Sequence, residues 1–237
     1  MRTLILGTCY IAAGNEGAQN YKSSVVKLWL DLAAKLNPGM DILLVDACSP
    51  VDLEQLLGEV EADVTVHRFG ENVGHLNTTG RDGWGRAFCF GVEYAIKHGY
   101  DYLAYIDADI IFTKPIRPIL TNMYLHNMVA AMPPAINYAF WENGMMFLSV
   151  PYLKMTDFVA LYDWENRTHD MPIPELACEN LFGGSLFLLP IRAYRDTAGA
   201  LSVNNIEHAF PYGMDALTHV RDFRVYQKFV AMKGIEL

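Results

Sequence analysis

The chain has 237 residues, of which 52% are hydrophobic and 19% are charged, a composition that supports a substantial core and argues against disorder. Its net charge is −9 and it has no cluster of lysines or arginines, so we expect no nucleic-acid partner, although an anionic substrate can still bind through a metal ion. No apolar stretch reaches about 18 residues and the four cysteines form no CxxC pair, so we expect no membrane span, no zinc site and a reducing, cytoplasmic location.

Apolar runs alternate with helical periodicity over the first 112 residues. Short apolar runs bounded by polar or glycine residues predict strands, and apolar positions three to four apart predict helices. We expect strands at residues 4–6, 41–45, 64–69 and 102–106, and helices at about 21–36, 51–57 and 86–98. This alternation predicts an α/β fold with a parallel sheet that is covered by helices on both faces.

Polar side chains recur where the predicted strands end. Thr8 and Tyr10 follow the first strand, Asp46 follows the second, and Asp107 and Asp109 follow the fourth. Ligands of parallel sheets bind in the crevice at the carboxyl ends of the strands. We therefore expect these side chains to lie along one binding crevice.

The aspartate pair is the most informative of these strand ends. In an extended chain, side chains two apart point the same way, so Asp107 and Asp109 can converge on one cation. Two carboxylates beside so apolar a run are costly without a counter-charge. A hard divalent ion such as Mg²⁺ or Mn²⁺, itself holding a diphosphate, supplies that charge. The pair therefore predicts a metal site.

The second half of the chain is less regular. We expect strands at residues 143–148, with a close backbone approach at Gly144, and at residues 183–189, with mixed helix and loop between them. No linker, repeat or low-complexity tract divides the sequence. We therefore expect one domain over residues 1–237, with a nucleotide-sugar-binding half at about 1–112 and an acceptor-binding half at about 113–237.

The assembled pattern resembles the GT-A glycosyltransferases, especially the broad family-2-like group that uses nucleotide-diphosphate sugars. The resemblance is carried by Asp46, the segment from Asn72-Val73-Gly74 to residues 80–87, the pair of Asp107 and Asp109, and Asn143-Gly144. The match runs from residue 4 to about 112 and continues more weakly to about 220. It implies a Rossmann-like, mostly parallel sheet, a nucleotide-diphosphate sugar as donor and Mn²⁺ or Mg²⁺ as cofactor.

The resemblance also implies roles for single residues. In such enzymes the aspartate after the second strand contacts the base or ribose, which falls here to Asp46. The segment before the long helix lies under the nucleotide, which suggests Asp82 and Arg86 near the uridine and diphosphate. The second aspartate of the pair usually ligates the metal, so Asp109 is the stronger metal ligand, and Asp107 is a second ligand or faces the ribose.

Many members of the group add a histidine from the C-terminal region to the metal. His219 is the first choice for this ligand and His208 is the second. Inverting members also often carry a Glu-Asp pair after the acceptor strand, with one carboxylate as the general base. This chain departs from that pattern because Glu179 is followed by Asn180, which cannot take a proton. Glu179 and its rival Glu175 are therefore both candidates for the base, and the stereochemical outcome stays open.

These implications predict a metal-dependent transferase of hexosyl or related sugars, as in polysaccharide biosynthesis, with a UDP-sugar favoured as donor and a hydroxyl of a glycan or other acceptor as target. Three alternatives stay open. A nucleotidyltransferase normally has a basic, glycine-rich loop after its first strand, which Gly7-Thr8-Cys9-Tyr10-Ile11 lacks. A phosphohydrolase normally carries its aspartate pair on the first strand. A non-catalytic sugar-nucleotide-binding module is compatible with Asn180 in place of an acidic residue.

Overall fold

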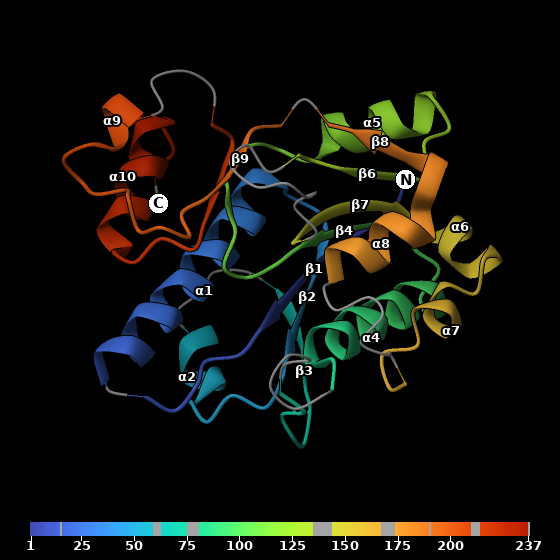
Figure 1. Cartoon of the computed structure of the whole chain (residues 1–237), viewed down its shortest axis with the longest axis horizontal. Helices are drawn as coiled ribbons and strands as arrows, with labels where there is room; N and C mark the ends of the chain where they lie inside the picture. Colours follow the sequence, from blue (N-terminus) through green and yellow to red (C-terminus); the bar gives the residue numbers. More distant parts are fainter. Residues whose placement is uncertain are drawn as a thin grey trace.

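The computed structural model describes residues 1–14, 16–58, 63–74, 81–134, 144–166, 174–189, 191–209 and 214–236. Its centre is a seven-stranded sheet with the strand order β3-β2-β1-β4-β7-β6-β8 (Figure 1). The strands of this sheet are β1 (Thr3–Cys9), β2 (Asp41–Asp46), β3 (Val64–Arg68), β4 (Tyr102–Ile106), β6 (Ala130–Met132), β7 (Met145–Ser149) and β8 (Leu186–Leu188).

The sheet is mostly parallel, as predicted. Strand β1 pairs in parallel with β2 and β4, and β2 pairs in parallel with β3. Strand β7 runs antiparallel to both of its neighbours, β4 and β6. The carboxyl ends of β1 to β4 therefore lie along one edge of the sheet, where ligands of such sheets bind.

Helices cover both faces of the sheet. They are α1 (Glu16–Leu36), α2 (Leu53–Leu57), α4 (Gly83–Lys97), α5 (Arg117–Leu125), α6 (Val150–Met155), α7 (Phe158–Tyr162), α8 (Pro174–Phe182), α9 (Ile206–Ala209) and α10 (Phe223–Met232). Among these described helices, none combines the length and the hydrophobicity that a bilayer crossing requires.

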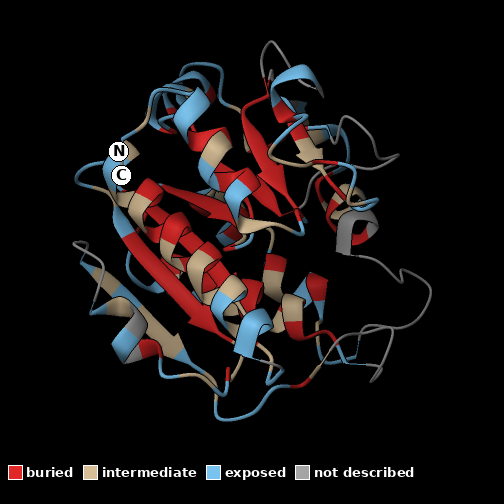
Figure 2. Cartoon of the chain, turned by 90° about the vertical axis from the view of Figure 1, so that its left-hand side faces the viewer, coloured by how far each residue is buried: buried red, intermediate tan, exposed pale blue. Residues whose placement is uncertain are grey.

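Alternate residues of each strand supply the two halves of the core, because successive strand side chains point to opposite faces. Ile5 packs in one apolar cluster with residues of α1 and α10, whereas Leu4 and Leu6 pack in the other with residues of α4, α6, α7 and α8. Gly91 allows α4 to approach β1 closely, since a Cβ there would lie 2.1 Å from Cδ2 of Leu6. Figure 2, viewed from the α1 side, shows the strands largely buried behind the helices.

A second, three-stranded sheet brings the C-terminal segment to the binding edge. Its strands are β5 (Ile111–Phe112), β10 (Ala216–Thr218) and β9 (Ala193–Arg195), in the order β5-β10-β9. Strands β5 and β10 are antiparallel, with Leu217 opposite Ile111. Since β5 follows β4 after a short turn, this pairing carries the end of β10 back to the carboxyl end of the main sheet.

Several predicted boundaries are corrected by the structure. Helix α4 begins at Gly83 and not at Arg86, because the side chain of Asp82 caps it by accepting from the Gly85 N–H. The predicted strand over residues 183–189 is wrong in its first half. Helix α8 runs to Phe182 and a short 3₁₀ helix, η1 (Gly183–Ser185), follows with Gly183 at φ +47°, so only residues 186–188 form a strand.

Candidate active site

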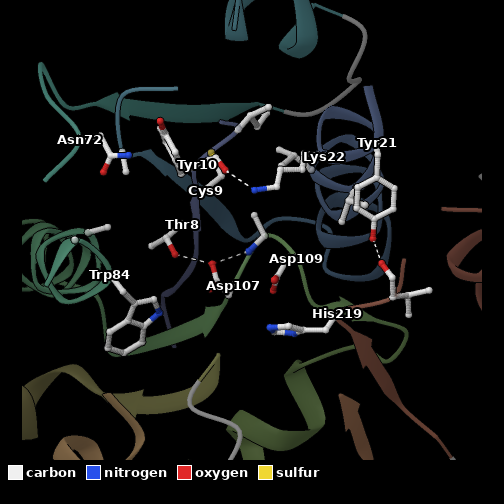
Figure 3. A pocket seen from close by; sticks show the side chains of 18 of the residues that line it. Thr8, Cys9, Tyr10, Tyr21, Lys22, Asn72, Trp84, Asp107, Asp109 and His219 are labelled. Carbon is white, nitrogen blue, oxygen red and sulfur yellow. Dashed lines mark hydrogen bonds between the residues drawn. The ribbon is translucent and has the colours of Figure 1, made fainter. Parts of the chain in front are cut away.

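A cavity of about 500 Å³ opens at the carboxyl ends of β1 and β4 (Figure 3). Its walls come from the loops after β1, β2 and β3, the second and third turns of α1, the start of α4, the turn after β4, and the segment that joins β10 to α10. Five of the candidate site residues line it: Thr8, Tyr10, Asp107, Asp109 and His219. The expected crevice at the strand ends is therefore present.

Asp107 is held in place by three groups. Its Oδ1 accepts a hydrogen bond from Oγ1 of Thr8 at 2.6 Å and one from the Ala108 N–H at 3.0 Å. Its own N–H donates to the carbonyl oxygen of Gly144 at 2.7 Å, next to the antiparallel pairing of β4 with β7. The hydroxyl of buried Tyr105 lies 2.9 Å from Oγ1 of Thr8. Both described hydrogen bonds to the carboxylate therefore go to Oδ1.

The surroundings of Asp107 disfavour its charged form. Burial raises the pKa of its carboxyl to about 7, with a further contribution from the negative charge of Asp109, and the hydrogen bonds from Thr8 and Ala108 only partly oppose this rise. A carboxylate in such a place is stabilised by a nearby cation. This electrostatic arrangement is the one expected of a cation site.

Asp109 and His219 line the same cavity from two different parts of the chain. Asp109 follows β4, whereas His219 follows β10 and has a left-handed backbone, with φ +61°. Thr218 lies between them, its Oγ1 3.2 Å from Oδ1 of Asp109 and 3.0 Å from Nδ1 of His219. In Figure 3 the imidazole lies beside the Asp109 carboxylate.

Asp107, Asp109 and His219 carry side chains of the types that bind hard divalent cations. Carboxylate oxygens and imidazole nitrogen are suitable ligands for Mn²⁺ or Mg²⁺. Within the described ranges, no group of three or more His, Cys, Asp or Glu side chains is arranged to hold a metal ion. Asp107, Asp109 and His219 line the same cavity, but they do not by themselves form a three-residue metal site.

The sequence analysis missed the residues that α1 and α10 contribute to the cavity. Lys22 and Tyr21 come from α1 and Tyr226 from α10, whereas Trp84 of α4 belongs to the segment 80–87 that was expected under the nucleotide. The ammonium of Lys22 lies 3.5 Å from the carbonyl oxygen of Tyr10, and the hydroxyl of Tyr21 donates to the carbonyl oxygen of Val220. Polar residues at the start of the apolar stripe of α1 were the available signal, but that stripe was used only to predict a helix.

Asp46 does not face the cavity, contrary to the predicted contact with the base or ribose. Its carboxylate is fully buried and accepts from the Ser49 N–H at 3.0 Å and from the Ser49 hydroxyl. Nε of Arg68 lies 3.4 Å from its Oδ2. Ser49 in turn accepts from the Ile11 N–H at 2.8 Å. Oδ1 of Asp46 also accepts from Sγ of Cys9, at the end of β1, at 3.8 Å. Asp46 thus ties the loop after β2 to β1 and β3.

Asp82 and Arg86 are likewise engaged in structural contacts outside the cavity lining. Asp82 is buried, and its carboxylate accepts from the Gly85 N–H and from the hydroxyl of Tyr162, each at 2.8 Å. The Asp82 carboxylate therefore caps the N-terminus of α4. The Arg86 guanidinium lies over the Phe69 ring at 4.0 Å and donates to the Glu71 carbonyl oxygen at 3.2 Å.

The remaining candidates also lie outside the cavity lining. Glu179 is half-buried on α8, and its neighbour Cys178 points into the core. The side chain of Glu175 lies outside what the structure describes. His208 is exposed on α9. Of the two histidines, the structure brings only His219 to the cavity.

Comparisons with known proteins agree with the fold. No described protein family matches the sequence, and no curated protein is similar to it. A Desulfovibrio desulfuricans protein, described as a candidate nucleotide-diphospho-sugar transferase, superposes with a TM-score of 0.58 at 13% identity, covering 99% of this chain and 98% of that one. The Streptococcus pneumoniae glycosyltransferase GlyE gives 0.58 at 14% identity, covering 97% of this chain and 59% of GlyE.

A third structure belongs to a different class of enzyme. The 4-diphosphocytidyl-2C-methyl-D-erythritol synthase of Anaerococcus prevotii superposes with a TM-score of 0.51 at 10% identity, covering 79% of this chain and 86% of that one. At such identities the similarity concerns the fold alone. Together with the sheet order, it shows that the chain has the GT-A fold of nucleotide-diphospho-sugar transferases.

Proposed function

We propose that this chain is a divalent-metal-dependent glycosyltransferase that moves a sugar from a nucleotide-diphosphate donor to a hydroxyl group of a glycan or small-molecule acceptor. The observation that carries the proposal is the convergence of Asp107, Asp109 and His219 on one cavity at the carboxyl ends of β1 and β4. UDP-sugars are the favoured donors on the sequence resemblance. We also expect one domain over residues 1–237, acting in the cytoplasm.

In this proposal the protein binds the donor through its diphosphate. Asp109 and His219 would hold Mn²⁺ or Mg²⁺, and Asp107 would be a third ligand or would accept from the ribose hydroxyls. The ion would act as a Lewis acid for the leaving diphosphate. Lys22 reaches the same cavity, where its ammonium would add positive charge near the diphosphate. Tyr10, with 40% of its surface exposed, offers an aromatic face to the base.

The acceptor hydroxyl must lose its proton during transfer. Glu179 is our proposed general base in an inverting reaction, with Glu175 as its rival, and the resemblance of residues 178–180 to the acidic motif of inverting members supports this assignment. Glu179 is half-buried on α8, which packs with α4 and α7 on the same face of the main sheet. A carboxylate base there would act on an acceptor bound beside α8.

Nucleotidyl transfer is the second candidate. The similarity to the Anaerococcus prevotii synthase supports it, and so does Lys22. The loop after β1 has no basic residue, but this lysine of α1 reaches the cavity that the loop lines. The two reactions release different products, since a nucleotidyltransferase consumes a nucleoside triphosphate and releases pyrophosphate, whereas a glycosyltransferase releases a nucleoside diphosphate.

The decisive experiment is a screen of UDP-, GDP- and dTDP-sugars with and without Mn²⁺. Thermal unfolding reports binding, and release of nucleoside diphosphate reports turnover or donor hydrolysis. We expect Mn²⁺-dependent binding and turnover with a UDP-sugar, abolished in Asp109→Ala and unchanged in Glu93→Gln, an exposed carboxylate on α4. Full Mn²⁺-stimulated activity in Asp109→Ala would contradict the proposal. Binding without any turnover would indicate a non-catalytic module. A parallel assay with nucleoside triphosphates tests the second candidate, because release of pyrophosphate there would indicate nucleotidyl transfer.

A further inference from the structure

The hydroxyl of Thr218 bridges the two side chains that face the cavity from opposite strands. Its Oγ1 is 3.2 Å from Oδ1 of Asp109 and 3.0 Å from Nδ1 of His219. Thr218 is 1% exposed, and its carbonyl oxygen accepts from the Asp196 N–H at 2.9 Å. The bridging hydroxyl therefore stands on a fixed, buried strand end, whereas Asp109 and His219 are both exposed.

The chemistry of the three groups fixes which atom carries each proton. A hydroxyl has one proton to donate, and a carboxylate can only accept. The Thr218 proton must therefore go to Asp109, and Oγ1 must accept from Nδ1 of His219. An imidazole that donates from Nδ1 carries its lone pair on Nε2 when it is neutral.

We propose that Thr218 is a positioning residue that orients the Asp109 carboxylate and selects the Nδ1–H tautomer of His219. Each of the two side chains then keeps one ligand atom, Oδ2 of Asp109 and Nε2 of His219, for a cation. Groups that hydrogen-bond to metal ligands set the tautomer and the ring orientation in this way. The inference about the His219 tautomer stands on the geometry alone. The inference that Oδ2 and Nε2 bind a cation, called the metal part below, rests on the proposed function.

The tautomer is measured on the metal-free protein by two-bond ¹H–¹⁵N correlation spectra at about pH 8, where imidazoles are generally neutral. His219→Ala identifies the signals of His219. We expect the Nδ1–H tautomer in the wild type and in Thr218→Ser, and a shift toward the Nε2–H tautomer in Thr218→Val. Valine keeps the shape and the β-branching of threonine, which suits a buried strand position.

The metal part is measured as the Mn²⁺ concentration that half-saturates the binding of UDP. We expect Thr218→Val to raise this concentration about 10- to 100-fold, the usual effect of removing such a partner, and Thr218→Ser to restore it. Thr113→Val is the matched control, because Thr113 is buried beside β5 and its hydroxyl donates to the Asp215 carbonyl oxygen at 3.1 Å, away from the cavity lining. It should change neither the tautomer nor the Mn²⁺ requirement.

An Nε2–H tautomer in the wild type, or an unchanged tautomer in folded Thr218→Val, would overturn the proposed role of Thr218. A changed tautomer with an unchanged Mn²⁺ requirement would overturn the metal part. If the wild type shows no Mn²⁺-dependent binding of any nucleotide, the proposed function fails, while the tautomer measurement still decides the role of Thr218. Unfolding of Thr218→Val alone, with Thr218→Ser folded and normal, leaves the wild-type tautomer as the deciding result.

Discussion

The pairing of β5 with β10 brings Asp109 and His219 to the same cavity. Ala216 lies opposite Phe112 and Leu217 opposite Ile111, Asp109 lies two residues before β5, and His219 directly follows β10. Asp109 itself lies in the turn between β4 of the main sheet and β5 of the small one. A single pairing between distant parts of the chain therefore decides which C-terminal side chain reaches the aspartate pair.

Replacing His219 should separate stability from metal binding. The φ of +61° at His219 is one that glycine adopts freely and alanine does not. We expect His219→Gly to unfold at higher urea than His219→Ala, by about 1 kcal/mol in the free energy of unfolding. Both variants should need more Mn²⁺ for UDP binding and turnover, because both lack the imidazole.

Asn127 offers a matched control for this comparison, since its φ is +52° and it lies outside the cavity lining. Asn127→Gly should likewise be more stable than Asn127→Ala, with no effect on the Mn²⁺ requirement. Normal Mn²⁺ dependence in either His219 variant would remove this histidine from the metal site.

The stability of the metal-free protein should fall as the pH rises, through Asp107. Its folded-state pKa of about 7 exceeds the ordinary value of about 3.9, so its contribution to stability is fully present below about pH 4 and is lost as the pH rises through 7. Mn²⁺ with UDP should therefore raise the unfolding temperature more at about pH 8 than at about pH 6, because ligation needs the deprotonated carboxylate. Thermal unfolding of Asp107→Asn is the comparison, and it should lack this pH dependence. An equal pH dependence in that variant would assign it to another group.

Asp46 should matter for stability and not for nucleotide affinity. In Asp46→Asn an NH₂ group replaces one carboxylate oxygen, so that it faces the donor groups of Ser49 and Arg68 without a hydrogen bond. We therefore expect a loss of about 1–3 kcal/mol in the free energy of unfolding. Urea denaturation measures this loss, and calorimetry with UDP and Mn²⁺ below the unfolding transition should give unchanged affinity. Asp52→Asn is a suitable control, because Asp52 caps α2 through the Gln55 N–H and asparagine caps equally well. Weakened UDP binding in a fully stable Asp46→Asn would restore the predicted donor contact.

The fold was predictable because it depends on patterns that are local in the sequence. The apolar runs and helical periodicity of residues 4–112 are enough to give strands β1 to β4, and parallel strands bring their carboxyl ends together. Thr8, Tyr10, Asp107 and Asp109 could therefore be placed at one edge. The end of α8 was predicted less well, because Gly183 can continue a helical turn as readily as it can begin a strand.

The direction in which a side chain points at that edge was less predictable. Asp46 is the last residue of β2, and Asp107 directly follows β4. The carboxylate of Asp46 nevertheless turns away from the cavity, because it accepts from Ser49, three residues further along the chain. The role of Thr218 depends on a contact across 109 positions of sequence. Lys22 and Tyr226 lie on helices whose apolar spacing hides cavity-facing residues among core ones. Partners of this kind are set by tertiary packing, which periodicity alone does not encode.

The final prediction concerns the proposed base. Glu179→Gln keeps the size of the side chain and removes its ability to take a proton, so kcat should fall by about 10²- to 10⁴-fold, the usual contribution of general-base catalysis. UDP affinity should stay nearly unchanged, because Glu179 lies outside the lining of the cavity that holds Asp107 and Asp109. Steady-state kinetics with the UDP-sugar and calorimetry with UDP separate the two effects, and Glu93→Gln serves as the exposed control. Weakened UDP binding would make Glu179 a structural residue. Undiminished turnover would move the base to Glu175 or favour a retaining reaction, in which no protein carboxylate at this position is required to deprotonate the acceptor.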